Sequence, residues 1–199
     1  MLGLLLKDLY NLRKQAIWYL SMIVVFFGLS IILNNVAFAS TIGILVTISM
    51  PLTAIAYEEK DGWQKFVVAS GTKISTIVGE KYLLGIVFAA IGLIAYSLTF
   101  MLVVQTEQSA VEYTLPACMQ FFTLAVILPV IFRFGVEKGR AYMIVVIVII
   151  MLMLIGVLTF LKDVDKGETL LIICAWVVAA VVTVVSYFIS VRIYKKKEF

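Results

Sequence analysis

The sequence contains no histidine, and its 199 residues include only two cysteines and three prolines. Histidine is the most common metal ligand and catalytic base in proteins, so its absence excludes the usual metal centres and histidine-based catalysis. Charged residues are also scarce, at 14% of the chain, whereas hydrophobic residues make up 63%. Together with a mean hydropathy of +1.12, this composition is typical of a membrane protein.

Catalytic groups are missing from the apolar segments as well. A membrane protease or lipid-processing enzyme would need a Ser–His pair, a metal set or paired carboxylates within the membrane, and the sequence has none of these. Glu58 and Glu59 are neighbours without a histidine partner, and we interpret them as a solvated helix end. We expect no catalytic site, metal or cofactor in this chain. Cys118 and Cys174 lie in apolar segments and are predicted to be small buried side chains, with a disulfide or a reactive thiol as the alternative.

Long uncharged runs predict an all-α membrane protein with six transmembrane helices in a single domain, 1–199. Four of these runs each fit one bilayer crossing of about 20 residues. A fifth run, from Gln15 to Tyr57, holds 43 residues and must turn back, so we place a turn at Asn34-Asn35. A secretory signal ending near residue 40 is the alternative, but this apolar stretch exceeds the usual length of about 7 to 15 residues. The predicted transmembrane helices are 16–33, 36–57, 82–105, 113–132, 142–161 and 169–191.

The distribution of basic residues predicts the orientation. If the N-terminus is cytoplasmic, the segments 1–15, 58–81, 133–140 and 192–199 hold fourteen of the sixteen lysines and arginines. This is a strong positive-inside pattern, so we expect a multi-pass protein with both termini in the cytoplasm. We attribute the net charge of +4 to the basic residues that set the membrane topology and attract anionic lipid. We expect no nucleic-acid partner.

The first fifteen residues have an amphipathic pattern. Leucines 2, 5, 6, 9 and 12 share one helical stripe, with Lys7 and Lys14 opposite. The pattern predicts a helix along the lipid headgroups, and an extension of the first transmembrane helix is the open alternative. The basic tail 192–199 is predicted to be a cytoplasmic anchor that reaches lipid phosphates.

The segment 58–81 has internal structure that a simple anchor would not need. Trp63, Phe66 and Val67 are spaced for one face of a short helix, with Asp61, Gln64 and Lys65 directed away from it. Ser70 to Thr72 is predicted to form a corner before a second helix that runs into Lys81. The aromatic face either rests on lipid or fits a groove in another protein.

A phosphate-binding loop is excluded in this segment, because its spacing would need a glycine at Phe66 and a lysine directly after Gly71. The six predicted helices also carry no acidic or basic side chain in their interiors, which argues against a proton-coupled carrier. Sodium coupling through carbonyls and hydroxyls stays open. Pro51 and Pro129 are predicted to bend the second and fourth helices, as hinges or as packing kinks.

Three blocks of sequence resemble a known family. They are "LLLKDLYNLRKQ", "YEEKDGWQKFVVASGTKISTIVGEKYLLG" and "LPVIFRFGVEKGRAY". With them the whole chain resembles the small bacterial permeases of ABC-2 type transporters. Many of those relatives look as though they carry Pro-x-Ser/Thr-Arg where this chain has Gly71, Thr72 and Lys73.

The resemblance implies a permease in the bacterial cell membrane that pairs with a second copy or a sister chain. Two separate ATP-binding cassette subunits, holding ATP and Mg, would dock beneath the pair. Relatives export peptides or lipid-like, amphipathic molecules. Carried over by position, the docking helix would be Glu58, Glu59, Lys60, Asp61, Trp63, Phe66 and Val67, its corner would be Ser70, Gly71, Thr72 and Ile74, and the interfacial helix beside it would include Leu2, Leu5, Leu6, Leu9 and Lys14.

Two other functions stay open at this point. A substrate-binding component of a vitamin uptake system would have a similar length and about six helices, with a polar pocket near the outer face. The available cluster for that pocket is Gln105, Glu107, Gln108, Glu112 and Tyr113. The second alternative is a membrane protein without transport activity, such as an immunity or scaffold protein.

Overall fold

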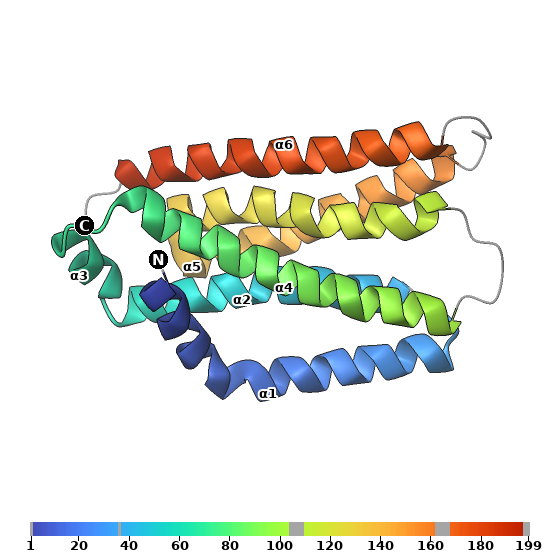
Figure 1. The fold of residues 1–199 in the computed structure, drawn as a ribbon, viewed down its shortest axis with the longest axis horizontal. Helices are drawn as coiled ribbons and strands as arrows, with labels where there is room; N and C mark the ends of the chain where they lie inside the picture. Colours follow the sequence, from blue (N-terminus) through green and yellow to red (C-terminus); the bar gives the residue numbers. More distant parts are fainter. Residues whose placement is uncertain (1, 36, 104–109, 162–167, 197–199) are drawn as a thin grey trace.

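The computed structural model describes residues 2–35, 37–103, 110–161 and 168–196, and these residues form a helical bundle without strands (Figure 1). The predicted all-α class is therefore confirmed. The helices are α1 (Leu2–Ile32), α2 (Ala37–Lys60), α3 (Trp63–Ala69), α4 (Ile74–Val103), α5 (Ala110–Leu161) and α6 (Glu168–Lys195).

Helix α1 is bent into two parts, Gly3–Arg13 and Ile17–Ile32, which meet at 70°. The first part is visible in Figure 1 as the dark blue segment set at an angle to the rest of α1. A straight extension of the first transmembrane helix does not fit this bend, whereas a separate N-terminal helical segment does. Its position along the lipid headgroups stays a prediction.

The turn predicted at Asn34-Asn35 is present. Helix α1 ends at Ile32, and Asn34 has a positive φ of 49°, a conformation that asparagine tolerates better than most residues. Ser30 Oγ donates a hydrogen bond to the Asn35 carbonyl at 2.6 Å, and Asn35 N donates to the Ser30 carbonyl at 3.0 Å. These bonds satisfy polar groups at the helix end and direct the chain into α2.

Helix α5 contains both the predicted helix 113–132 and the predicted helix 142–161. Gly135 interrupts the helical backbone with φ 79° and ψ 173°, a conformation that is accessible mainly to glycine. In Figure 1 the yellow first part of α5 runs toward the end of the bundle that carries α3, and the orange second part runs back toward the start of α6. The segment predicted as a connecting loop, 133–140, is therefore a tight corner between two helical parts.

Among the residues that the structure describes, four helical segments are long and apolar enough to cross a membrane: Phe38–Lys60, Ile74–Leu102, Thr114–Ile149 and Ile172–Lys195. The bent pair in α1 raises the number to five if it forms one crossing. The predicted number of six is not confirmed by this criterion, since α5 is counted as one helix. Pro51 and Pro129 lie inside α2 and α5, and their role as hinges stays a prediction.

Helix α2 lies at the centre of the bundle, with 72% of its apolar window buried, whereas the corresponding window of α6 is 11% buried. One core cluster includes Ile48 and Ile55 of α2, Val67 of α3 and Leu128 of α5. Cys118 is buried as predicted, but Cys174 is exposed on α6, and neither forms a disulfide. The expectation of two buried thiols is wrong for Cys174 because no other described part of the chain covers the outer face of α6.

Helices α2 and α4 cross closely at two glycines. A Cβ on Gly92 would lie 3.0 Å from the Gly43 Cα and 3.1 Å from Oε1 of Gln120. The absence of side chains at both positions allows the two backbones to approach.

Gly92→Val is expected to force α2 and α4 apart. Overpacking of this kind costs about 1–3 kcal/mol, or a fall of about 2–12 °C in apparent melting temperature for a chain of this size. Gly28→Val is the matched control, because nothing lies within 4 Å of a Cβ at Gly28. Equal losses in both variants, measured by thermal unfolding in the same detergent, would contradict the close crossing.

Candidate functional site: a buried charge cluster beside helix α3

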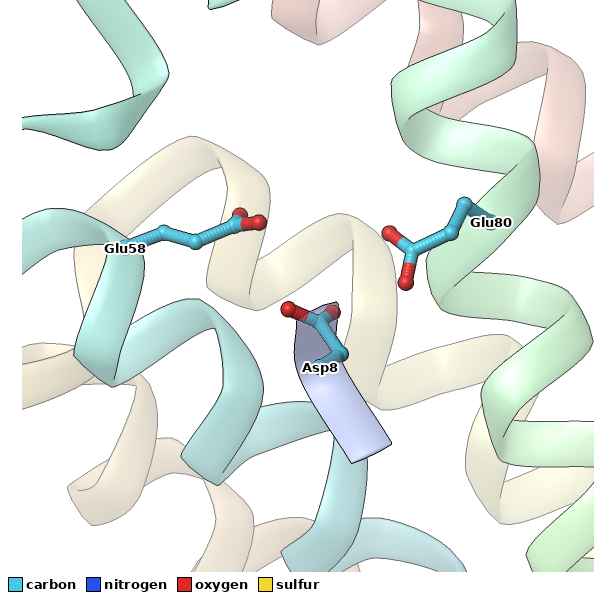
Figure 2. A group of neighbouring side chains, drawn as sticks. All are labelled: Asp8, Glu58 and Glu80. Atoms are coloured by element: carbon cyan, nitrogen blue, oxygen red, sulfur yellow. The ribbon is translucent and has the colours of Figure 1, made fainter. Parts of the chain in front are cut away.

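Five ionisable side chains meet where α1, α2 and α4 come together next to α3. Lys81 is central, and its Nζ lies 2.8 Å from Glu58 Oε1 and 3.0 Å from Glu80 Oε2 and also pairs with Asp8 Oδ2. Lys7 supplies a second cation, whose Nζ lies 2.9 Å from Asp8 Oδ1 and also pairs with Glu58 Oε1. Figure 2 shows the three carboxyl groups pointing toward one another from three different helices. We call these five residues the charge cluster.

The charge cluster is shielded from solvent. The side chains of Asp8, Glu80 and Lys81 are at most 1% exposed. Desolvating an ion costs several kcal/mol, and this cost is offset only where each charge has close partners of opposite sign. Because Lys81 pairs with three carboxylates at once, it is the group whose loss leaves the most uncompensated charge.

The three carboxyl groups could in principle form a cation site, since one oxygen of each lies within 4.8 Å of the others. The ammonium group of Lys81 already pairs with each of them. The Lys81 ammonium group therefore already neutralises these carboxylates in place of a metal ion. A metal ion would have to displace Lys81, and nothing in the described residues favours that exchange.

Two expectations from the sequence are corrected here. Glu58 was predicted to be a solvated helix end, but it is 5% exposed, whereas its neighbour Glu59 is exposed as predicted. The predicted bounds of two helices are also wrong, because α2 extends to Lys60 and α4 begins at Ile74, and so both include charged residues that were assigned to a connecting loop. The charge cluster lies near the end of α2 and the beginning of α4, next to α3. Its charged residues do not form a path across the bundle.

Helical spacing contained a signal for the charge cluster. Asp8 lies four residues from both Leu4 and Leu12, and Lys81 lies four residues after Ile77 and three before Leu84. These spacings put Asp8 and Lys81 on the same helical faces as apolar residues that pack into the core. A positive and a negative charge on separate buried faces indicate a pair, but the sequence does not say which helices meet.

Helix α3 is held between two glycines with left-handed backbones, Gly62 (φ 65°) and Gly71 (φ 77°). Residues beyond both glycines belong to the charge cluster: Glu58 precedes α3, and Glu80 and Lys81 follow it. The corner predicted at Ser70 to Thr72 is present, with Ser70 Oγ donating to the Val67 carbonyl at 2.7 Å. The α2–α3–α4 hairpin is therefore fixed at its base and contains a glycine at each end of α3.

The predicted aromatic face of α3 is only partly open. Val67 is buried in the core, together with Gln64, so the expected direction of Gln64 away from the apolar face is wrong. Trp63 is half-buried, and Lys7 Nζ lies 4.9 Å from its ring centroid. Phe66 packs against Trp63 with a centroid distance of 5.1 Å and is 62% exposed. Of the three apolar residues, Phe66 is thus the one that projects outward.

The other predicted docking residues have mixed positions. Four of them are exposed: Lys60, Asp61, Ser70 and Gly71. Thr72 and Ile74 are half-buried. In the predicted interfacial helix Leu6 and Leu9 are exposed, Leu5 packs against the second core cluster, and the side chains of Leu2 and Lys14 lie outside the described part of the chain.

Glu59 joins the hairpin to the corner in α5. Its Oε2 accepts a hydrogen bond from the Val136 backbone at 3.0 Å, directly after the break at Gly135. Beside this bond is a pocket of about 610 Å³ whose walls include Lys60, Lys138 and Arg140. Glu59 was expected as part of a solvated helix end and of a docking surface, and in the structure it also connects α2 to α5.

A family model described as "ABC-2 family transporter protein" matches residues 3–195. The chain belongs to the ABC-2 family of transporter proteins. Proteins of this family are membrane components of transporters that work with ABC ATPase subunits. No curated protein and no solved structure matches the chain.

Lys81→Met is expected to destabilise this ABC-2 protein strongly, because three carboxylates would lose their shared cation. Breaking a buried ion pair by removing one partner costs about 3–5 kcal/mol, which is a fall of about 6–20 °C in apparent melting temperature. The same substitution at the exposed Lys65 is expected to change the stability by no more than about 0.5 kcal/mol. Comparable melting temperatures for the two variants would contradict the central role of Lys81.

A second substitution tests the pairing itself. In the Lys81→Met background, Asp8→Asn is expected to restore part of the lost stability, since it removes one uncompensated negative charge. Contacting charges show coupling energies of about 0.5–3 kcal/mol in double-mutant cycles. Additive losses in the four proteins of the cycle would show that Asp8 and Lys81 do not form a pair in solution.

Proposed function

We propose that this ABC-2 protein is the permease of an exporter and that helix α3 is the element on which a separate ATPase subunit docks. The observation that carries the proposal is the exposed Phe66 on a short helix between two hinge-like glycines. This helix belongs to the segment 58–81, which is one of the four segments that together hold most of the basic residues of the sequence. An aromatic anchor with a polar rim is a typical arrangement for a docking surface.

The contacts of α3 supply two routes by which a push from the ATPase would reach the membrane helices. Val67 packs directly into the main core cluster together with Ile77 and Val136. Trp63 lies under Lys7, which belongs to the charge cluster. A displacement of α3 would therefore act on α1, α2 and α4 together, and through Glu59 also on the corner of α5.

The proposed arrangement has six membrane crossings, with the two parts of α5 on either side of Gly135 as separate crossings and both termini in the cytoplasm. Its support is the doubling back of α5 (Figure 1) and the basic residues in the expected cytoplasmic segments. Two such chains, identical or related, would form the transport path between them, in the bacterial cell membrane.

The proposed substrate is a peptide or a lipid-like, amphipathic molecule, and ATP and Mg belong to the partner subunit. This substrate class follows from the family resemblance. For the vitamin-binding alternative, Gln105, Glu107 and Gln108 lie outside the described residues, as do the side chains of Glu112 and Tyr113. Membership of the ABC-2 family favours the permease over that alternative and over a scaffold protein.

Phe66→Ala is expected to weaken the docking of the ATPase. Loss of a central aromatic anchor costs about 2 kcal/mol or more, which is roughly a thirtyfold loss of affinity. Trp18→Ala is the matched control, because Trp18 on α1 is an aromatic side chain that is 71% exposed and Phe66 is 62% exposed. Co-purification with the ATP-binding subunit of the same transporter measures the effect.

Trp63→Ala combined with Phe66→Ala extends the test to the half-buried partner of Phe66. We expect the paired substitution to abolish co-purification while the melting temperature of the permease alone stays high enough for isolation. Undiminished recovery of the ATPase with the double variant would contradict the assignment of α3 as the docking element.

A further inference from the structure

A groove of about 570 Å³ lies between α4 and α6. At one end its lining is polar, with the hydroxyl-bearing Ser75 and Thr76 in the first turn of α4. Farther along, the lining includes Thr183 and several exposed apolar side chains. The apolar side chains are Leu83, Ile86, Val184 and Phe188.

The groove opens toward the region that the bilayer would occupy. Its two walls belong to candidate membrane spans, and only 33% of the apolar window of α4 and 11% of that of α6 are buried within the chain. An exposed apolar groove on such helices is filled by hydrocarbon from the surrounding bilayer. The acyl chains of a lipid therefore match the apolar part of the groove.

Cations continue the same face of α6 beyond the groove. Val184, Phe188, Arg192 and Lys195 follow one another at intervals of four, four and three residues, which places them on one helical stripe. Arg192 and Lys195 are exposed and line a second hollow of about 450 Å³ together with Ile189 and Ile193. Between Ile172 and Lys195 the sequence of α6 has no acidic residue, and the next one along the chain is Glu198.

The polar end of the groove and the two cations lie at the same end of the bundle. Tyr187 Oη donates a hydrogen bond to the Ser75 carbonyl at 3.2 Å, and Arg192 follows Tyr187 by five residues. Figure 1 shows the beginning of α4 and the end of α6 at the end of the bundle that carries α3. A molecule with its hydrocarbon in the groove would thus place its headgroup near Ser75, Arg192 and Lys195.

We propose that the α4–α6 groove is a binding site for one anionic phospholipid, with its acyl chains along Val184 and Phe188 and its phosphate held by Arg192 and Lys195. Charge complementarity selects this occupant, because two exposed cations beside an apolar groove favour a lipid with net negative charge over a zwitterionic one. The proposal goes beyond the transport function and does not depend on it, since the binding is a property of this chain without any ATPase.

Native mass spectrometry of the purified protein in detergent provides the test, with phosphatidylglycerol and phosphatidylcholine of identical acyl chains supplied in equal amounts. We expect the protein to retain phosphatidylglycerol preferentially. The paired substitution Arg192→Gln and Lys195→Gln is expected to weaken this retention by roughly tenfold or more, the scale for the loss of two basic groups near lipid phosphate.

The matched control removes the same two residue types elsewhere, by Lys138→Gln and Arg140→Gln, which are exposed after the corner of α5. This control is expected to retain phosphatidylglycerol as the unchanged protein does. Equal retention of both lipids by the unchanged protein, or an equal loss in the two double variants, would overturn the proposal in favour of general attraction to basic surface.

A second pair of variants tests the groove independently of charge. Val184→Trp fills the groove and is expected to reduce the retention of phosphatidylglycerol, whereas Val181→Trp, at a similarly exposed residue of α6 that does not line the groove, is expected to leave it unchanged. If Val184→Trp instead separates a dimer into monomers without any change in lipid retention, a second copy of the chain occupies the groove and the lipid assignment is wrong.

Discussion

The arrangement of this protein depends on one ammonium group, that of Lys81, which is shared by the carboxylates of Asp8, Glu58 and Glu80. Without it, three helices would present buried negative charge to one another, and their close approach would be unfavourable. With it, the N-terminal segment, the end of α2 and the beginning of α4 form one unit at the base of α3. The same unit that stabilises the bundle therefore also determines what a force on α3 would move.

The helices differ in how much of their apolar surface is buried within the bundle. Helix α2 is enclosed by its neighbours, and it approaches α4 closely at Gly43 and Gly92. Helix α6, in contrast, shows most of its apolar surface to the outside. The buried α2 and the charge cluster thus belong to the interior of the bundle, while the α4–α6 face has room for molecules from the bilayer.

Much of the fold could be predicted from the sequence, because long uncharged runs and an Asn-Asn turn determine helix positions almost directly. The corner in α5 was less predictable, since Gly135 replaces a whole loop by one left-handed residue. The candidate site was harder still. Spacing places Asp8 and Lys81 on buried faces, but their pairing is a tertiary contact that a single sequence does not contain. The pattern of α3 indicated an aromatic residue on its outer face, and Phe66 is exposed there. The same pattern misplaced Gln64, because the burial of Gln64 depends on the neighbouring core.

The contact between Asp8 and Lys81 joins residues that are 73 positions apart in the chain. During synthesis at about 5–20 residues per second, Asp8 precedes its partner by roughly 4–15 seconds. Over this interval the N-terminal segment carries a carboxylate that has no buried cation to meet, so its docking into the bundle must wait until α4 has been made. The N-terminal segment consequently reaches its final place later than its early synthesis would suggest.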